Sequence, residues 1–334
     1  MKAAIFHEHG SIENLRYEDI PEPDVGSDEC LLKVKAVALN GFDPMILRGI
    51  PGLKIPLPMV PGGDIVGEIF QVGVEVDNSC WKIGQRVQIM PNQGRSGMMG
   101  ETRWGGASEY VTCSQEYLIP IPDEVSDIQA ACLPVAYGTA HRMMLTRGNI
   151  QKDEKILILS AASGVGTCCV QLAKQAGCHV VAVASSDEKL EKLKKIGADH
   201  TINSSTQDVV EEVINRYGKP KIWGGGGVDV LVNYTGGDTW AQTFRAVTRQ
   251  GRILVCGATA GYNPKTDLRY IWSFEFNIIG CNGWDRNDLE KLLELVADGS
   301  IEPVVHSVRP LADIRQSMQE LSDRKVVGKV ILIP

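Results

Sequence analysis

The sequence predicts an α/β protein with two domains, one of which is built on a doubly wound parallel sheet. Its 334 residues, 43% of them apolar and 22% charged, have the composition of a globular chain. At about 150 residues per domain, this length suggests two domains. Strand and helix patterns alternate between residues 155 and 257. This alternation predicts parallel strands with helices on both faces of the sheet.

The stretch before residue 123 has the pattern of an antiparallel sheet. It is rich in Gly and Pro, and short alternating runs such as residues 30–37 and 106–111 are typical of strands joined by turns. A helical patch at 127–144 follows. We expect the tail to return to the first domain, so that the parallel-sheet domain is an insertion. The expected parts are a first domain at 1–124, the parallel-sheet domain at 125–268, and the sheet edge with the return at 269–334.

Each element of the alternating segment has its own pattern. Short apolar runs predict strands at 155–160, 179–184, 228–233 and 252–257. Apolar residues at helical spacing predict helices at 166–175, 187–196 and 239–247. Beyond the sheet, we expect helices near 287–297 and 311–321 and a closing strand at 329–333.

Charge and cysteine usage exclude several classes of protein. Lys and Arg number 34 against 41 Asp and Glu, and a net charge of -7 differs from the basic footprint of a nucleic-acid-binding protein. No apolar run approaches the ~18 residues of a membrane span, and Glu8 interrupts any signal peptide. Nine cysteines without a C-x-x-C pair fit reduced thiols. We therefore expect a cytoplasmic protein that binds neither nucleic acid nor a membrane.

A turn between a strand and a helix carries the first functional signal. In residues 156–166, Ile-Leu-Ile-Leu-Ser-Ala-Ala-Ser-Gly-Val-Gly, small side chains let backbone N–H groups approach a pyrophosphate at the helix N-terminus. Ala161 and Ser163 replace the first two glycines of G-x-G-x-x-G, so the motif alone also fits an ordinary tight turn. Its place in a βαβ unit favours a dinucleotide site. The expected cofactor contacts are Ser163, Gly164, Val165 and Gly166.

The end of the second strand predicts NADPH as the cofactor. An NAD site usually presents a carboxylate there to the ribose 2′-hydroxyl, whereas Ser185, Ser186 and Lys189 suit a 2′-phosphate. Asp187 and Glu188 argue for NAD, but they also complement the dipole of the next helix. The alternative is that Ser185 and Lys189 are only a helix cap and part of a solvated face.

Several motifs in order then carry a family resemblance. They are Val60-Pro-Gly-Gly-Asp-Ile-Val-Gly67, Gly84-Gln-Arg-Val87, Gly105-Gly-Ala-Ser-Glu-Tyr-Val111, Leu133-Pro-Val-Ala-Tyr-Gly-Thr-Ala140, Ala161-Ala-Ser-Gly-Val-Gly166, Gly197-Ala-Asp-His-Thr-Ile-Asn203, Gly251-Arg252 and Gly328-Lys-Val330. Over nearly its whole length, the chain resembles the medium-chain dehydrogenase/reductase superfamily. The resemblance implies a GroES-like β-rich catalytic domain, a Rossmann domain and nicotinamide-dependent hydride transfer.

The zinc alcohol dehydrogenases of this superfamily have three metal ligands, and this chain departs from each. Asn40 stands where their first cysteine begins its motif, and Gly63-Asp64 stands where they have His-Glu. Their third ligand falls near Val135, with Cys132 close by. Because zinc needs several thiolate or imidazole ligands, we expect no catalytic metal.

The remaining pattern is similar to the zinc-free quinone oxidoreductases and enoyl reductases. Their typical Ala-Leu-Asn-x-x-Asp reads here as Ala38-Leu-Asn-Gly-Phe-Asp43. The resemblance places Asn40 and Asp43 beside the nicotinamide and the substrate as candidate catalytic residues, with Tyr137 as a candidate donor to an enolate. Loop capping is the alternative for Asn40 and Asp43, and packing is the alternative for Tyr137.

Further cofactor contacts follow from the same resemblance. Thr139 is expected near the nicotinamide ring. The other expected contacts are Asn203, the last residue of the motif at 197–203, and the loop residues Thr235, Gly257, Ala258 and Asn282.

These observations predict an NADPH-dependent reductase of conjugated carbonyl compounds, whether quinones, enones or enoyl thioesters. Without a Lewis acid an alkoxide lacks its main stabiliser, whereas an enolate needs only hydrogen-bond donors and a proton. Two alternatives stay open, namely a zinc-type alcohol dehydrogenase with unorthodox ligands and an NADPH-binding protein with little turnover. The apolar segment 270–280 predicts a sheet edge that pairs with a second copy, so we expect a homodimer.

Overall fold

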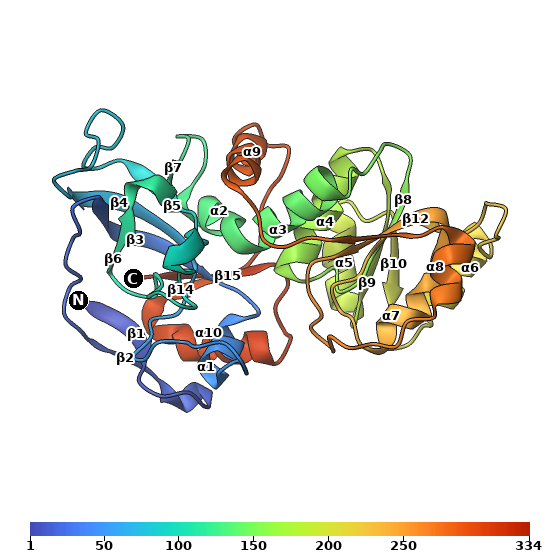
Figure 1. The fold of residues 1–334 in the computed structure, drawn as a ribbon, viewed down its shortest axis with the longest axis horizontal. Coiled ribbons are helices and arrows are strands. Elements are labelled where there is room, and N and C mark those ends of the chain that lie inside the picture. Colours follow the sequence, from blue (N-terminus) through green and yellow to red (C-terminus); the bar gives the residue numbers. More distant parts are fainter. The chain divides into compact units, whose positions relative to one another are not determined.

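The structure, a computed structural model, describes residues 1–334, and the chain forms two compact units (Figure 1). Unit 1 consists of Met1–Ala136 and Leu289–Pro334, and unit 2 is Tyr137–Asp288. The chain therefore leaves unit 1 once, builds unit 2 and returns. No helix has both the length and the apolar character needed to cross a membrane.

Unit 1 is the GroES-like, β-rich part. Its main sheet has the order β14-β15-β3-β4-β5-β7, and β6 also pairs with β3. These strands are β3 (Glu29–Leu39), β4 (Asp64–Val72), β5 (Arg86–Ile89), β6 (Tyr110–Ser114), β7 (Leu118–Pro120), β14 (Val305–Pro310) and β15 (Lys329–Ile333). A second sheet pairs β1 (Lys2–Phe6) with β2 (Leu15–Asp19). The helices are α1 (Asp43–Arg48), α2 (Asp127–Ala131), α10 (Ile314–Ser322) and α9 (Arg286–Ala297), which begins at the end of unit 2.

Unit 2 is the Rossmann part, a six-stranded parallel sheet with the order β10-β9-β8-β11-β12-β13. The strands are β8 (Lys155–Ile158), β9 (His179–Ala184), β10 (His200–Asn203), β11 (Val228–Val232), β12 (Val247–Val255) and β13 (Asn277–Gly280). The helices are α3 (Gly138–His141), α4 (Gly164–Gln175), α5 (Asp187–Lys195), α6 (Val209–Tyr217), α7 (Asp238–Thr243) and α8 (Leu268–Phe274). Helices α4 and α5 lie on one side of the sheet, and α6 and α8 lie on the other (Figure 1).

The unit boundaries differ from the expected domain boundaries. The first lies at 136/137 rather than 124/125, and the second lies at 288/289, within the expected part 269–334 that holds the sheet edge and the return. Helix α2 packs against β3 and β4, which keeps it in unit 1. At the other end, α8 packs on β12 and β13 extends the parallel sheet, so the segment after 268 continues unit 2.

The expectation of a continuous apolar sheet edge over 270–280 is wrong. Residues up to Phe274 form α8, and only β13 is a strand. The side chain of Asp267 accepts from the Arg269 N–H and caps the helix, and Glu275 ends it in the left-handed conformation. These polar residues at both ends override the strand-like apolar run between them.

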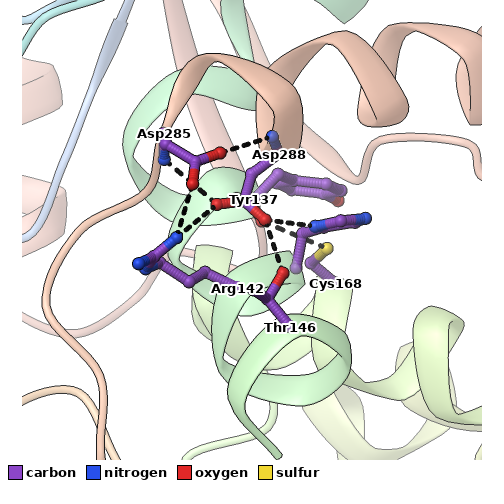
Figure 2. A network of polar contacts seen from close by, with 7 residues as sticks. Tyr137, Arg142, Thr146, Cys168, Asp285 and Asp288 are labelled. Carbon is purple, nitrogen blue, oxygen red and sulfur yellow. Dashed lines mark hydrogen bonds and ion pairs between the residues drawn. The ribbon is translucent and has the colours of Figure 1, made fainter. Parts of the chain in front are cut away.

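A polar network joins α3 and the π-helical residues Arg142–Arg147 to Asp285 and to Asp288 in the first turn of α9 (Figure 2). The buried Asp288 carboxylate accepts from Thr146 Oγ1 at 2.8 Å and Arg142 Nη1 at 3.2 Å, and it pairs with His141 Nδ1 at 2.8 Å. Burial alone raises the pKa of Asp288, but the hydrogen bonds outweigh it and hold the pKa below its usual range. The network therefore anchors the last residues of unit 2 with a paired charge.

Candidate active site

In unit 1, three strand ends bring polar side chains together. Strand β3 lies between β15 and β4, with Val330 opposite Leu39 and Ala38 opposite Asp64. Asn40 directly follows β3, and Lys329 precedes Val330. The pairing register alone therefore places Lys329, Asn40 and Asp64 next to one another at the same edge of the sheet.

The three side chains form a closed, buried triangle of hydrogen bonds. Lys329 Nζ donates to Asn40 Oδ1 at 2.6 Å and to Asp64 Oδ2 at 2.7 Å. Asn40 Nδ2 donates to Asp64 Oδ2 at 2.9 Å, and the Val135 N–H donates to Asp64 Oδ1 at 2.8 Å. The exposed fraction is 0% for Asp64, 2% for Lys329 and 6% for Asn40. The site thus holds a buried ion pair with an amide bound to both charges.

Asp43 is a second buried carboxylate beside this triangle. It begins α1, and it accepts from the Asn40 N–H at 2.6 Å and from the Gly62 N–H at 3.1 Å. Burial raises the pKa of Asp43 to about 7, with a smaller contribution from the charge of Asp64, while the two N–H groups and Lys329 oppose the shift. Asp43 therefore changes its charge close to neutral pH.

The charge on Asp64 is balanced differently. Burial raises the pKa of the Asp64 carboxyl, and the charge and hydrogen bond of Lys329 are the largest opposing effects. The Asn40 amide and the Val135 N–H also stabilise the carboxylate form. Asp64 depends on the lysine, whereas Asp43 relies mainly on backbone N–H groups.

In unit 2, the turn between β8 and α4 has the geometry of an anion site. Ser163 caps α4 by accepting from the Gly166 N–H at 3.0 Å, and its hydroxyl also bonds the Tyr234 hydroxyl at 2.9 Å. A Cβ on Gly166 would lie 2.6 Å from the backbone of Ala161, so only glycine fits this close turn. The first-turn N–H groups of an α-helix lack intrahelical acceptors and favour an anion. This cradle fits a pyrophosphate.

Most of the expected cofactor residues lie at one edge of the unit 2 sheet. The strands are parallel and their carboxyl ends meet there, with the order reversing between β8 and β11, where ligands bind in doubly wound sheets. Residues that follow or end these strands are Ser163, Gly164, Val165, Gly166, Ser185, Ser186, Asn203, Thr235, Gly257, Ala258 and Asn282. Thr235 also bonds Ser160 Oγ at 3.1 Å. The topology therefore gathers the set, while each residue's contact with a cofactor stays a prediction.

At the end of β9, the acidic residues have structural partners. Asp187 Oδ1 accepts from Asn203 Nδ2 at 2.7 Å, and Glu188 pairs with Lys192 at 3.0 Å. Ser186 caps α5, with its hydroxyl 3.5 Å from the Lys189 N–H. The Oδ1 of Asn203 also accepts from the Ser205 N–H. Both the nitrogen and the oxygen of this side-chain amide therefore have hydrogen-bond partners within the protein.

Two expected residues belong to the start of unit 2. Tyr137 is fully buried, and its carbonyl oxygen accepts from the Cys168 thiol (Figure 2). Thr139 lies in α3 and is 9% exposed. The burial of Tyr137 favours packing, and the roles of both residues stay predictions.

Comparison with known proteins identifies the family. The model of the "Alcohol dehydrogenase GroES-like domain" family matches residues 26–123, and that of the "Zinc-binding dehydrogenase" family matches 164–298. The human "Synaptic vesicle membrane protein VAT-1 homolog" is 30% identical, over 93% of this chain and 80% of its own length. The chain belongs to the medium-chain dehydrogenase/reductase superfamily.

Two further members of the superfamily are similar over the whole of this chain. The "NADPH-dependent alkenal/one oxidoreductase, chloroplastic" of Arabidopsis thaliana is 28% identical over 100% of this chain and 80% of its own length. A crystal structure of an "NAD-dependent alcohol dehydrogenase" superposes with a TM-score of 0.91, 30% identity and 100% coverage of both chains. The chain is accordingly an oxidoreductase of the superfamily.

The residues that stand where the zinc enzymes have their ligands do not fit a zinc ion. Asn40 supplies only an amide, and its Oδ1 already accepts from the Lys329 ammonium. A histidine cannot replace Gly63 without movement, because a Cβ there would lie 2.8 Å from the Met99 carbonyl oxygen. Val135 faces Asp64 through its N–H, and the Cys132 thiol donates to the Ile128 carbonyl.

Sequence reasoning missed Lys329 as a site residue. It stands in the Gly-Lys-Val motif at the start of the closing strand, where a lysine precedes four apolar residues. A charge at the start of a buried strand is the signal that points to a buried partner. The identity of that partner depends on the pairing of β15 with β3, which the sequence pattern does not give.

The raised pKa of Asp43 predicts a stability that falls as pH rises. Its folded-state pKa of about 7 exceeds the ordinary value of 3.8, so the folded protein binds the proton more tightly than the unfolded chain. Relative to Asp43→Asn, the free energy of unfolding of the wild type should fall between about pH 4 and 7, by up to about 4 kcal/mol, and stay level above. Urea unfolding at several pH values measures this difference.

The exposed Asp123→Asn is the matched control and should show no such decline. A wild type whose stability relative to Asp43→Asn rises across the same pH range would contradict the assignment.

Proposed function

We propose that this oxidoreductase is a zinc-independent, NADPH-dependent reductase of conjugated carbonyl compounds. The observation that carries the proposal is the buried Lys329 ammonium, which bonds Asp64 and also Asn40, the residue that stands where the zinc enzymes have their first cysteine. In the zinc enzymes a metal Lewis acid stabilises the alkoxide during alcohol oxidation. The donor set of this site instead suits a substrate whose oxygen gains charge gradually and accepts hydrogen bonds.

The residues of unit 1 provide such a donor. A bound reduced nicotinamide would supply a hydride to the β-carbon of the conjugated carbonyl compound, and a proton from water at the α-carbon would complete the reduction. Between these two steps the carbonyl oxygen carries enolate charge and needs a hydrogen-bond donor. Asn40 Nδ2 uses one hydrogen for Asp64 and retains a second one, which we assign to that oxygen. Asp43 holds the Asn40 backbone N–H and so fixes the loop.

The relatives support the same class of substrate. The Arabidopsis relative carries alkenal/one reduction in its name, and this chain aligns with it from end to end. The similarity to an alcohol dehydrogenase structure favours the alternative reaction, and the experiment therefore measures both. A broad panel of enones, quinones and enoyl thioesters covers the proposed substrates.

We expect the metal-free protein to reduce at least one conjugated carbonyl compound with NADPH and to oxidise simple alcohols poorly. Asn40→Ala should lower kcat about 100-fold, since loss of one oxyanion donor costs about 10²–10³ in rate, while the Kd of NADPH changes little. The exposed Asn78→Ala is the control. Activity lost on chelation and restored by zinc, or alcohol oxidation as fast as enone reduction, would refute the proposal.

The proposed preference for NADPH rests on the end of β9. The acidic residues that would bind a ribose hydroxyl are tied to Asn203 and Lys192. We assign the 2′-phosphate to Ser185, Ser186 and Lys189, which follow the strand. A cation beside a phosphate makes a charge-assisted hydrogen bond. Such a bond favours the phosphorylated cofactor.

Lys189→Glu should therefore remove most of the preference for NADPH. A charge-assisted hydrogen bond is worth roughly 1.5–3 kcal/mol, so the ratio of the two Kd values should fall about ten- to a hundredfold. Titration of both cofactors followed by fluorescence measures the ratio. Lys195→Glu, at the exposed far end of the same helix, should leave it unchanged, and tighter NADH binding by the wild type would end the hypothesis.

We also propose a homodimer that forms through the edge of the unit 2 sheet. Strand β13 is the edge strand, and Ile278 on it is 42% exposed. Next to it in the chain, Leu268 and Trp272 are 66% and 71% exposed and lie four residues apart on α8. Their spacing puts both on one helix face. An apolar face beside an open strand edge suits a second copy related by a two-fold axis.

Light scattering should give a mass of about 73 kDa, twice the 36.4 kDa of the chain. Ile278→Lys should shift the mass towards the monomer, because a charge on an edge strand opposes pairing. Trp223→Lys, at a residue 84% exposed in a loop, is the control and should stay dimeric. A wild-type monomer at micromolar concentration would rule the dimer out.

A further inference from the structure

The Lys329 ammonium is a buried charge with only two acceptors. They are Asn40 Oδ1 and Asp64 Oδ2, at 2.6 and 2.7 Å, and the side chain is 2% exposed. Burial of an ion pair costs several kcal/mol of hydration per ion. Replacing such a pair by apolar residues of similar volume often leaves the stability of a protein unchanged or raises it. Packing alone therefore does not account for a lysine at the start of β15.

The lysine has a definite effect on the Asn40 amide. An ammonium only donates and a carboxylate only accepts, so Oδ1 must face Lys329 and one Nδ2 hydrogen must face Asp64. This removes the usual ambiguity of an amide orientation. The ammonium also draws electron density towards Oδ1, which strengthens the amide N–H groups as donors. The second Nδ2 hydrogen is thereby both oriented and polarised.

We propose that Lys329 is the positioning residue of this site and that it fixes the Asn40 amide in one orientation. The proposal rests on the proposed function where it makes Asn40 the donor to the substrate oxygen. Lys329 itself acts through Asn40.

The first experiment compares Lys329→Met with Lys329→Arg. The methionine keeps the length and removes the charge, so kcat should fall about ten- to a hundredfold while the Kd of NADPH stays within about twofold. The arginine keeps the charge and should recover part of the loss. Lys35→Met is the matched control, because Lys35 also pairs with a carboxylate, Glu68 at 3.0 Å, on the same sheet but partly exposed. It should keep the wild-type kcat.

A double variant shows whether Lys329 acts through Asn40. Asn40→Ala removes the amide, so adding Lys329→Met should cause little further loss of kcat. Losses that multiply would mean that the lysine acts by another route and would overturn the proposal. A wild-type kcat in Lys329→Met would overturn it as well.

A second readout does not need turnover. In ¹⁵N-labelled protein, the side-chain amide signals of Asn40, assigned by their loss in Asn40→Ala, should shift in Lys329→Met and stay in place in Lys35→Met. Unchanged signals in Lys329→Met would refute the orientation by the lysine. If no conjugated carbonyl compound is reduced, the proposed function fails, and this measurement still decides the role of Lys329.

A further variant covers a failure of Lys329→Met to fold. Removal of the lysine alone leaves Asp64 buried without a cation, which is strongly destabilising. Lys329→Met combined with Asp64→Asn removes both charges and should fold. It should show the same loss of kcat and the same kind of shift in the Asn40 amide signals. A wild-type kcat in this double variant would overturn the proposal.

Discussion

The buried ion pair between Lys329 and Asp64 is the interaction on which unit 1 depends. Its two members belong to β15 and β4, and Asn40 of the strand between them binds both. Strand β15 returns to the sheet after the whole of unit 2, so the pair joins the first and last parts of the chain. An error in the register of β15 by one residue would turn Lys329 to the other face and leave Asp64 unpaired in the interior.

Unit 2 follows a different constraint, the common direction of its strands. Parallel strands deliver every following loop to one edge, so the topology brings residues scattered from 163 to 282 to the same edge of the sheet. Gly166 is in addition fixed by its close approach to Ala161, which excludes a side chain. The parallel sheet thus gathers a site by topology, whereas the triangle of unit 1 needs three particular side chains in hydrogen-bonding contact.

This difference explains what the sequence allows one to predict. The turn at Ser163–Gly166 and the strands around it are local patterns, and they are confirmed at β8, α4 and β9. Strand β10 escaped notice because Ile202 is its one apolar residue. Helix α6 has apolar residues at helical spacing, so its pattern is present in the sequence but is not among the elements predicted from it. The partner of Lys329 lies 265 residues away, at Asp64. No local periodicity encodes a pair of that separation, so only the folded sheet reveals it.

The two buried carboxylates of unit 1, Asp43 and Asp64, are stabilised by different groups. Asp64 has a lysine and an amide, whereas Asp43 has two backbone N–H groups and a pKa raised by burial to about 7. With Asp43 protonated, the cluster of Lys329, Asp64 and Asp43 is neutral, and above pH 7 it carries one negative charge. A developing enolate is negative and is opposed by that extra charge. The same buried carboxylate that fixes the Asn40 loop therefore makes the proposed chemistry most favourable below its own pKa.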